Sequence, residues 1–297
     1  MTIPDGIILI DKPAGITSHD VVAALRRALH IRRIGHGGTL DPGATGLLLV
    51  LVGRATRLAE YLGGGAKVYE ATIRFGIATD TDDADGRVIG TGPLPRVSFA
   101  QMHASRERFL GRIGQVPPTY SAVHHQGERA YKAARSGKTL ALEARTVHIE
   151  AIDLVAWNPP DLDIRVTCQS GTYIRSLARD WGGSLGSVAH LRALRRVRSG
   201  VFDVADSLTL LDAERLIVGG DLASVIRSPI PALIGALKQV AKLPPDEAER
   251  FAHGTTIERA SGAVGRHVVL SSEGMFLGVA DQRSDGMLVP RVVWSPA

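Results

Sequence analysis

The chain has 297 residues, of which 44% are hydrophobic and 22% charged, a composition typical of a globular protein with room for one large and one small domain. Its longest strongly apolar run, Leu47 to Val52, is too short to cross a bilayer, and no secretory signal pattern is visible, so no membrane association is expected. The single cysteine, Cys168, excludes an intrachain disulfide and a cysteine-based metal cluster, and favours a reducing, cytoplasmic environment.

The net charge of +5 arises from 35 Lys and Arg against 30 Asp and Glu, and it is unevenly distributed. Residues 228–297 hold 7 basic and 7 acidic side chains, so the whole excess lies in residues 1–227. Arginine outnumbers lysine, and its planar guanidinium suits phosphate oxygens. RNA is therefore the favoured partner on charge alone, with a solvated basic surface as the simpler alternative. The basic clusters are Arg26-Arg27, Arg32-Arg33 and Arg192-Arg195-Arg196-Arg198.

The N-terminal part begins with an expected short strand over Gly6 to Ile10. Thr17-Ser18 then offers an N-cap for a helix that runs to about His30. A glycine-rich loop follows this helix. After the loop, the sequence predicts an apolar strand that ends at Val52 and a short helix from Arg54 to Leu62.

The central part opens with apolar and polar residues that alternate from Val68 to Ile77, which predicts a half-buried strand. An acidic turn from Asp80 to Gly86 ends this strand. Ser98 is expected to cap a further helix. That helix would carry the apolar residues Phe99, Met102, Phe109 and Ile113.

Residues 115–146 interrupt the regular pattern, because Pro117-Pro118 opens a long polar and basic stretch. We interpret this stretch as a mobile insertion rather than core. Strands resume near 147–157 and 162–169, and a helix is expected to start at Gly171-Thr172.

Prolines mark a boundary between an expected catalytic domain of residues 1–228 and a smaller domain of residues 229–297. The smaller domain is predicted to hold a short helix at 246–253 and three short strands. Because strands dominate without regular strand–helix alternation, the chain belongs to the α+β class rather than to the doubly wound folds.

Nucleotide and metal motifs are missing from the sequence. Neither a phosphate-binding G-x-x-x-x-G-K-[ST] nor a G-x-G-x-x-G after a strand occurs. The ten histidines include no HExxH pair, and the neighbours His124-His125 would point to opposite faces of an extended segment. We therefore expect neither cofactor nor metal.

The most informative segment is residues 35–46, GHGGTLDPGATG. Its glycines permit tight turns and the close approach of a ligand, while Pro42 pushes Asp41 toward an extended conformation. Such a loop can present one carboxylate in one orientation beside a bulky substrate. Taken alone, it is better explained as a surface turn whose Asp bonds its own backbone.

Four segments support the functional interpretation together. They are residues 11–20 (DKPAGITSHD), 35–46, 67–69 (KVY) with 79–86 (TDTDDADG), and 170–175 (SGTYIR). In this order and spacing they resemble the TruB family of tRNA pseudouridine synthases. The resemblance covers residues 5–215 and continues into the C-terminal domain, where 251–254 and 275–294 look like the PUA-type RNA-binding fold of that family.

The resemblance implies the pseudouridine synthase fold, with a mixed, mainly antiparallel sheet flanked by helices. It also implies isomerisation of uridine 55 in the T-loop of tRNA, without redox change, cofactor or energy input. The insertion resembles the family's thumb, which favours a stand-alone, monomeric enzyme that needs no guide RNA.

The catalytic residues follow from the family by position. Asp41 matches the catalytic aspartate, which would act on the sugar either as a nucleophile at C1′ or by removing the 2′ proton. Arg175 matches the arginine that pairs with it, and a cation there would depress the carboxyl pKa. Tyr69 matches the tyrosine that stacks on the uracil, and Tyr173 a second pocket aromatic. Both Tyr173 and Arg175 are expected within the helix that starts at Gly171-Thr172.

Substrate-binding residues follow in the same way. His36 matches the residue that enters the RNA where the flipped base was, because a buried uridine must be extruded before reaction. Asp83 matches an acid that contacts the flipped nucleotides. Lys12, Lys67 and the Arg192–Arg198 cluster would be phosphate contacts that position the RNA without reading its sequence.

Two departures from the family pattern and two alternative functions complete the sequence analysis. Gly37 replaces the usual Ala or Thr and would loosen the loop, and His124-His125-Gln126 replaces a typical Lys-Val-Asn. A tRNA-binding folding chaperone would need the basic surface but no oriented Asp41. A nucleoside hydrolase would use the carboxylate but leaves the basic half and the C-terminal domain unexplained.

Overall fold

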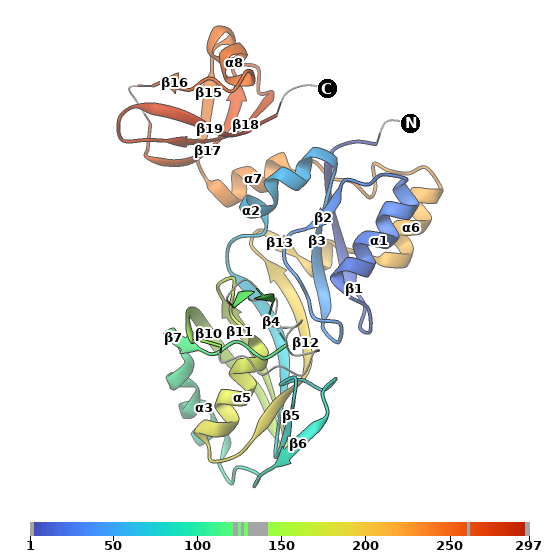
Figure 1. Cartoon of the computed structure of the whole chain (residues 1–297), viewed down its shortest axis with the longest axis vertical. Coiled ribbons are helices and arrows are strands. Elements are labelled where there is room, and N and C mark those ends of the chain that lie inside the picture. Colours follow the sequence, from blue (N-terminus) through green and yellow to red (C-terminus); the bar gives the residue numbers. More distant parts are fainter. Residues whose placement is uncertain (1–2, 121–123, 126–127, 130–141, 260–261, 295–297) are drawn as a thin grey trace.

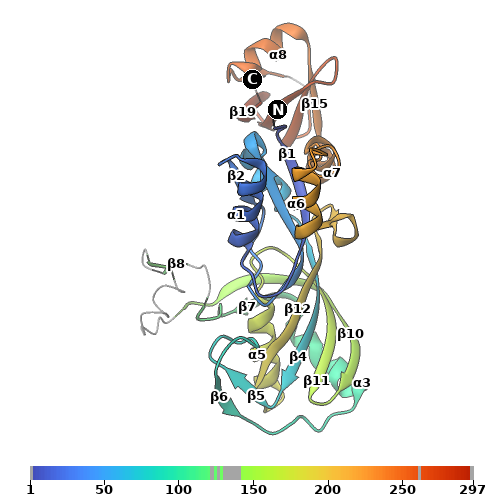
Figure 2. The ribbon, with the colours of Figure 1, turned by 90° about the vertical axis from the view of Figure 1, so that its right-hand side faces the viewer.

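The computed structural model describes residues 3–120, 124–125, 128–129, 142–259 and 262–294. The side chains of most of the predicted insertion lie outside the described residues. They include those of residues 124–126, where the sequence departs from the family pattern. Two sheets dominate the elongated molecule, and the smaller sheet lies at one end while the β5–β6 pair lies at the other (Figures 1 and 2). In the described part of the chain, we find no helix with the length and apolar character needed to cross a membrane.

The large sheet has ten strands in the order β14-β1-β3-β12-β4-β11-β10-β7, with β13 beside β12 and β2 beside β3. The β12–β3 and β1–β14 pairs are parallel, whereas β1–β3, β4–β12, β4–β11, β10–β11 and β7–β10 are antiparallel, which confirms the expected mixed sheet. Its strands are β1 (Gly6–Lys12), β2 (Ile34–His36), β3 (Thr45–Val52), β4 (Lys67–Phe75), β7 (Gly111–Gln115), β10 (Arg145–Asn158), β11 (Asp161–Cys168), β12 (Ala189–Ser199), β13 (Phe202–Asp203) and β14 (Leu208–Thr209).

Helices flank this sheet, and α5 lies against β4 and β12. The α-helices of this part are α1 (Ser18–Leu29), α2 (Ala59–Leu62), α3 (Phe99–Ser105), α5 (Ile174–Ser184), α6 (Leu210–Val218) and α7 (Ile230–Leu237). Short 3-10 turns are Gly53–Leu58, Arg106–Phe109 and Val204–Asp206. Two small strand pairs are β5 (Ile77–Thr79) with β6 (Val88–Thr91), and β8 (His124–His125) with β9 (Glu128–Arg129).

The small sheet has five strands in the order β15-β17-β18-β19-β16, and helix α8 (Pro245–Ala252) packs on it. Its strands are β15 (Val240–Leu243), β16 (Ile257–Glu258), β17 (Gly265–Ser271), β18 (Phe276–Gln282) and β19 (Met287–Val293).

Local signals in the sequence predict the element starts well. The Thr17 side chain accepts a bond from the backbone N–H of Asp20 and caps α1, which ends at Leu29. Ser98 caps α3 in the same way, but that helix is shorter than expected and ends at Ser105. Phe109 instead lies in a 3-10 turn and Ile113 on β7, because sheet pairing with β10 takes over the backbone bonds.

Side chains of β1 and β3 alternate between two apolar clusters. One face packs with α1, α5 and α6, while Ile7, Leu9 and Leu49 on the other face share a cluster with α7 and with Val268 of β17. The small sheet is therefore joined to the large one by buried apolar contacts.

Polar contacts reinforce this junction. The Arg57 guanidinium donates to the Val293 carbonyl at 2.8 Å, and the Arg266 guanidinium lies 5.0 Å from the centre of the Tyr61 ring. The two sheets consequently hold one another through both apolar and cationic side chains.

Candidate active site

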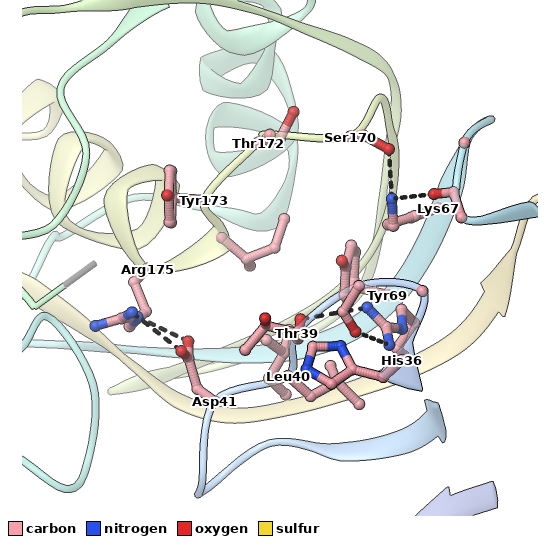
Figure 3. Close-up of a pocket in the computed structure, with 18 of the residues that line it drawn as sticks. His36, Thr39, Leu40, Asp41, Lys67, Tyr69, Ser170, Thr172, Tyr173 and Arg175 are labelled. Atoms are coloured by element: carbon pink, nitrogen blue, oxygen red, sulfur yellow. Dashed lines mark hydrogen bonds and ion pairs between the residues drawn. The ribbon is translucent and has the colours of Figure 1, made fainter. Parts of the chain in front are cut away.

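A cavity of about 820 Å³ opens where the Asp41 loop meets β4 and the first turn of α5 (Figure 3). Its wall includes six of the eight site residues predicted from the sequence, namely His36, Asp41, Lys67, Tyr69, Tyr173 and Arg175. The other two, Lys12 and Asp83, lie behind this wall.

Asp41 and Arg175 point toward one another across the cavity wall (Figure 3). Arg175 Nε lies 3.0 Å from Asp41 Oδ2, and Nη2 donates to Oδ1 at 3.2 Å. The guanidinium is further held by the carbonyls of Thr81 and Tyr120, each at 3.0 Å, and by Asp83 Oδ2 at 3.5 Å. The Arg175 side chain is only 6% exposed, whereas Asp41 is 40% exposed toward the cavity. The acid therefore faces substrate while its cation is fixed behind it.

The charge balance around Asp41 makes this carboxyl group hold its proton more tightly than an ordinary aspartate. Burial raises the pKa of Asp41, Arg175 opposes that shift, and the neighbouring acids Asp83 and Asp85 add to it. Arg175 thus lowers the pKa as expected, but the net direction is upward because burial outweighs the ion pair.

Lys12 is not a phosphate contact, since it is completely buried. Its ammonium donates to the carbonyls of Pro13, Ile16 and Pro42 at 2.8, 2.7 and 3.1 Å. Burial lowers the pKa of the Lys12 amine, although the negative charge of Asp41 opposes this shift. Lys12 therefore fixes Pro42, the residue that follows Asp41.

A second clamp fixes the residue that precedes the acid. The Ser18 hydroxyl accepts from the Leu40 N–H at 2.8 Å and donates to the Leu40 carbonyl at 3.1 Å. The Gly15 N–H donates to the Pro42 carbonyl at 2.9 Å. The DKPAGITS segment thus holds the chain on both sides of Asp41, which explains why the two motifs occur together.

Arg196 forms the floor of the cavity and supports the same loop from below. It is 2% exposed, and its guanidinium donates to the carbonyls of Leu47 at 2.8 Å and Gly38 at 3.2 Å. Sequence reasoning placed Arg196 among phosphate contacts and missed this support. The apolar neighbours that alternate with charges on β12 were the available signal for its burial.

The rest of the arginine cluster lies on the opposite face of the sheet. Arg192 pairs with Asp161, and Arg195 makes two bonds to Asp11 at 2.9 and 2.7 Å. The structure does not place the predicted phosphate contacts at these two positions on the cavity face. A register shift between Leu191 and Ala193, together with alternation along β12, turns both side chains away from the cavity, and carboxylates neutralise them.

Aromatic and basic side chains complete the cavity wall. Tyr69 of β4 is 8% exposed, and burial raises the pKa of its phenol. Tyr173 lies at the N-cap of α5, one residue before the helix, rather than within it. The Lys67 ammonium bonds the Gly63 carbonyl at 3.3 Å and the hydroxyl of Ser170, a residue that sequence reasoning missed. Burial lowers the pKa of Lys67, and the nearby guanidinium of the cavity floor adds to this shift.

His36 ends β2 at the rim of the cavity. Its buried Nδ1 has no hydrogen-bond partner among the described residues, and burial lowers the pKa of the ring. A neutral, flat imidazole at the cavity rim is suited to stack on a base.

Asp83 lies behind Arg175, beside a smaller cavity of about 80 Å³, and not on the main wall. Its Oδ1 accepts from the Thr81 hydroxyl at 2.5 Å and from the Asp85 N–H at 3.1 Å. In this structure it supports the arginine, in contrast to the contact with flipped nucleotides expected from the sequence.

Gly37 does not loosen the loop. Its N–H donates to the Leu49 carbonyl at 2.8 Å, and a Cβ atom at this position would lie 2.8 Å from Leu49 Cδ2. A larger side chain here would require the Leu49 side chain to shift, so glycine allows this residue to lie close against β3. Within residues 3–120, 142–259 and 262–294 we find no cluster of three or more His, Cys, Asp or Glu arranged to hold a metal ion.

Comparison with known proteins gives consistent results along the whole chain. Residues 26–174 match the model of the TruB family pseudouridylate synthase N-terminal domain, residues 175–229 the tRNA pseudouridylate synthase B C-terminal domain, and residues 240–293 the pseudouridine synthase II TruB C-terminal domain.

Individual relatives match over nearly their full length. The chain is 42% identical to tRNA pseudouridine synthase B of Trichormus variabilis over 98% of this chain and 99% of that protein, and 45% identical to the protein of the same name from Thermobifida fusca with the same coverage. Among solved structures, it matches a Cbf5-Nop10-Gar1 complex at TM-score 0.74 and 25% identity, over 98% of this chain and 85% of the other. The chain therefore belongs to the TruB family of pseudouridine synthases, and it is an enzyme that isomerises uridine to pseudouridine in tRNA.

Proposed function

We propose that the substrate is uridine 55 in the T-loop of tRNA and that Asp41 is the catalytic residue. The observation that carries this proposal is the Asp41–Arg175 pair at the wall of a cavity that also presents Tyr69 and Tyr173. A pure tRNA-binding chaperone has no use for a carboxylate fixed in this way.

The reaction breaks the N1–C1′ bond, turns the uracil over and joins C5 to C1′, while C5 loses a proton and N1 gains one. The ionised Asp41 acts on the ribose, as nucleophile at C1′ or as base toward the 2′ hydrogen, and both routes need the carboxylate free of its proton. Arg175 aims the acid, and Tyr69 stacks on the uracil and exchanges protons with it. Tyr173 supplies the second aromatic surface.

The flipped uridine leaves a gap in the folded T-loop, and we assign His36 to that gap. The neutral ring at the cavity rim has the shape to stack between bases. Lys67 remains the candidate phosphate contact inside the cavity wall.

The phosphates outside the cavity need other cations, because Lys12, Arg192 and Arg195 are occupied. We propose that Arg27, Arg32 and Arg33 take this role. All three are exposed where α1 ends and β2 begins, the strand that leads to His36. Binding is then expected to weaken with added salt.

The remaining assignments follow from the family. We propose a catalytic domain of residues 1–228, with a thumb-like insertion at about 115–146, and a PUA-like RNA-binding domain of residues 229–297. The relatives bear the name of tRNA-modifying enzymes, which supports a cytoplasmic, monomeric enzyme that acts without guide RNA.

The test is to treat unmodified tRNA transcripts with purified protein and map pseudouridine at single-nucleotide resolution. Pseudouridine at position 55 alone is expected, with none in a transcript that carries cytidine there. A product at another uridine would contradict the T-loop assignment while leaving the isomerase activity intact. Restored tRNA folding with no pseudouridine at any position would favour the chaperone.

A further inference from the structure

A buried glutamine at the end of β7 bonds the backbone at the start of α5. Gln115 is 2% exposed. Its Oε1 accepts from the Tyr173 N–H at 2.8 Å, and its Nε2 donates to the Tyr173 carbonyl at 3.0 Å. One side chain therefore satisfies both backbone groups of a residue that lines the cavity, as a neighbouring strand would.

The residues after Gln115 are fixed to the same helix. The Val116 carbonyl accepts from the Ser176 hydroxyl at 2.8 Å and from Arg179 Nη2 at 2.9 Å. Four residues further, the Tyr120 carbonyl accepts from Arg175 at 3.0 Å. The segment 115–120 and the first two turns of α5 consequently form one bonded unit.

This unit lies at the start of α5. The N-cap residue of that helix, Tyr173, makes no hydrogen bond from its side chain to the backbone of the first turn. Without another support, the first turn of a helix frays, and the direction of its side chains is poorly defined. Arg175 is the second residue of that helix, and its Nε must stay within 3.0 Å of Asp41.

We propose that Gln115 is a positioning residue for the isomerisation, one that fixes Tyr173 against the uracil and aims Arg175 at Asp41. It touches neither the uridine nor the reacting atoms, and acts through the backbone of the α5 N-cap. This inference rests on the roles proposed above for Asp41 and Arg175.

Gln115→Glu is the sharpest variant, because it keeps the size of the side chain and the acceptor but loses the donor to the Tyr173 carbonyl. Gln101→Glu is the matched control. Gln101 also accepts a backbone N–H, that of Ser98, but it is exposed on α3, away from the cavity. Ile152→Val, in the buried core, provides a variant that loses stability alone.

The measurement is the single-turnover rate of pseudouridine formation together with the Kd for tRNA. Gln115→Glu is expected to slow the rate by about 10- to 100-fold, because small misplacements of catalytic groups are costly, with Kd changed less than about two-fold. Both control variants should keep the wild-type rate. A Gln115→Glu rate equal to that of the controls, or a loss confined to Kd, would overturn the proposal.

The pH profile adds a readout that a merely structural role would not move. Arg175 on α5, Lys12 on β1, and Asp83 and Asp85 in the β5–β6 turn are the charged groups around Asp41. If Arg175 loses its alignment, the acidic limb of the rate moves to higher pH, and an unmoved limb counts against the proposal. All rates are followed at whichever uridine the wild-type enzyme converts, so a wrong T-loop assignment stays distinguishable from a wrong role for Gln115.

Discussion

The two faces of the ten-stranded sheet hold their cations in different ways. On the face without the cavity, Arg74 and Arg192 both pair with Asp161, Arg165 pairs with Glu70, and Arg195 pairs with Asp11. On the cavity face, neutral oxygens hold the cations. Lys12 and Arg196 donate hydrogen bonds to backbone carbonyls, and Lys67 donates to one carbonyl and one hydroxyl.

This difference shows where charge is available to a substrate. A carboxylate partner cancels the field of a guanidinium, whereas a carbonyl satisfies its hydrogen bonds and leaves its net charge in place. The cavity face therefore keeps a positive potential suited to RNA. On that face Arg175 pairs with Asp41, the carboxylate proposed above as catalytic.

The largest expected effect comes from Asp41→Asn, which removes the carboxylate proposed above as catalytic. We expect the single-turnover rate to fall by about 1,000-fold or more, while tRNA affinity stays near wild type. Tritium release from C5-labelled uridine and a filter-binding titration measure the two quantities. Release that is undiminished in the variant would refute the role of Asp41.

The same variant tests the pKa of Asp41 through stability. Because the folded-state pKa is raised, ionised Asp41 disfavours the fold at neutral pH, and this cost disappears below the unfolded value of 3.8. Asp41→Asn should therefore melt at or above the wild-type temperature at pH 7. A clear drop in Tm would show that the ion pair with Arg175 outweighs burial.

An intermediate effect is expected from Arg175→Lys, which keeps the charge but loses the two-pronged contact. The rate should fall by roughly 10- to 100-fold. Activity requires the ionised acid and is lost as pH falls through its pKa. Lysine keeps the charge that lowers this pKa but loses the Arg175 hydrogen bond that also lowers it, so the acidic limb of the rate should move slightly to higher pH. A pH–rate profile of both proteins decides, and a shift to lower pH would contradict the ion-pair assignment.

The smallest expected effects come from removing single arginines, one from the neutralised face and one from the proposed phosphate contacts. Arg192→Ala on the neutralised face should change the rate and the salt dependence of tRNA binding very little, and stability by less than about 1 kcal/mol, because exposed ion pairs contribute little. Arg32→Ala is the matched test at the proposed phosphate contacts. It should reduce the slope of log Kd against log salt by about 1. Equal slopes in both variants would show that Arg32 contributes no more to phosphate binding than the neutralised Arg192.

Much of the fold was predictable because its signals are local. Alternation of apolar residues located β4, and side-chain oxygens at Thr17 and Ser98 located two helix starts. The insertion expected at residues 115–146 lies mostly outside the described residues and stays a prediction. The helix after Ser98 was overextended because Phe109 and Ile113 fit a helical spacing, although pairing of β7 with β10 fixes them otherwise.

The site was predictable in identity but not in arrangement. Motif resemblance named Asp41 and Arg175, yet only the fold brings two residues 134 positions apart to within a hydrogen bond. Lys12 looks like a surface cation in the sequence, and nothing local indicates that it is buried. For Arg196 the alternation of apolar and charged residues was the only local signal, and only the fold places its side chain beneath the loop.

By itself, the sequence determined the secondary structure, the rigid loop and the family, because these depend on neighbouring residues and on recognisable motifs. The tertiary structure decided which cations are free, which are neutralised and how the pKa of Asp41 is shifted. Those properties depend on burial and on distances between residues far apart in the chain, and only the folded backbone sets them.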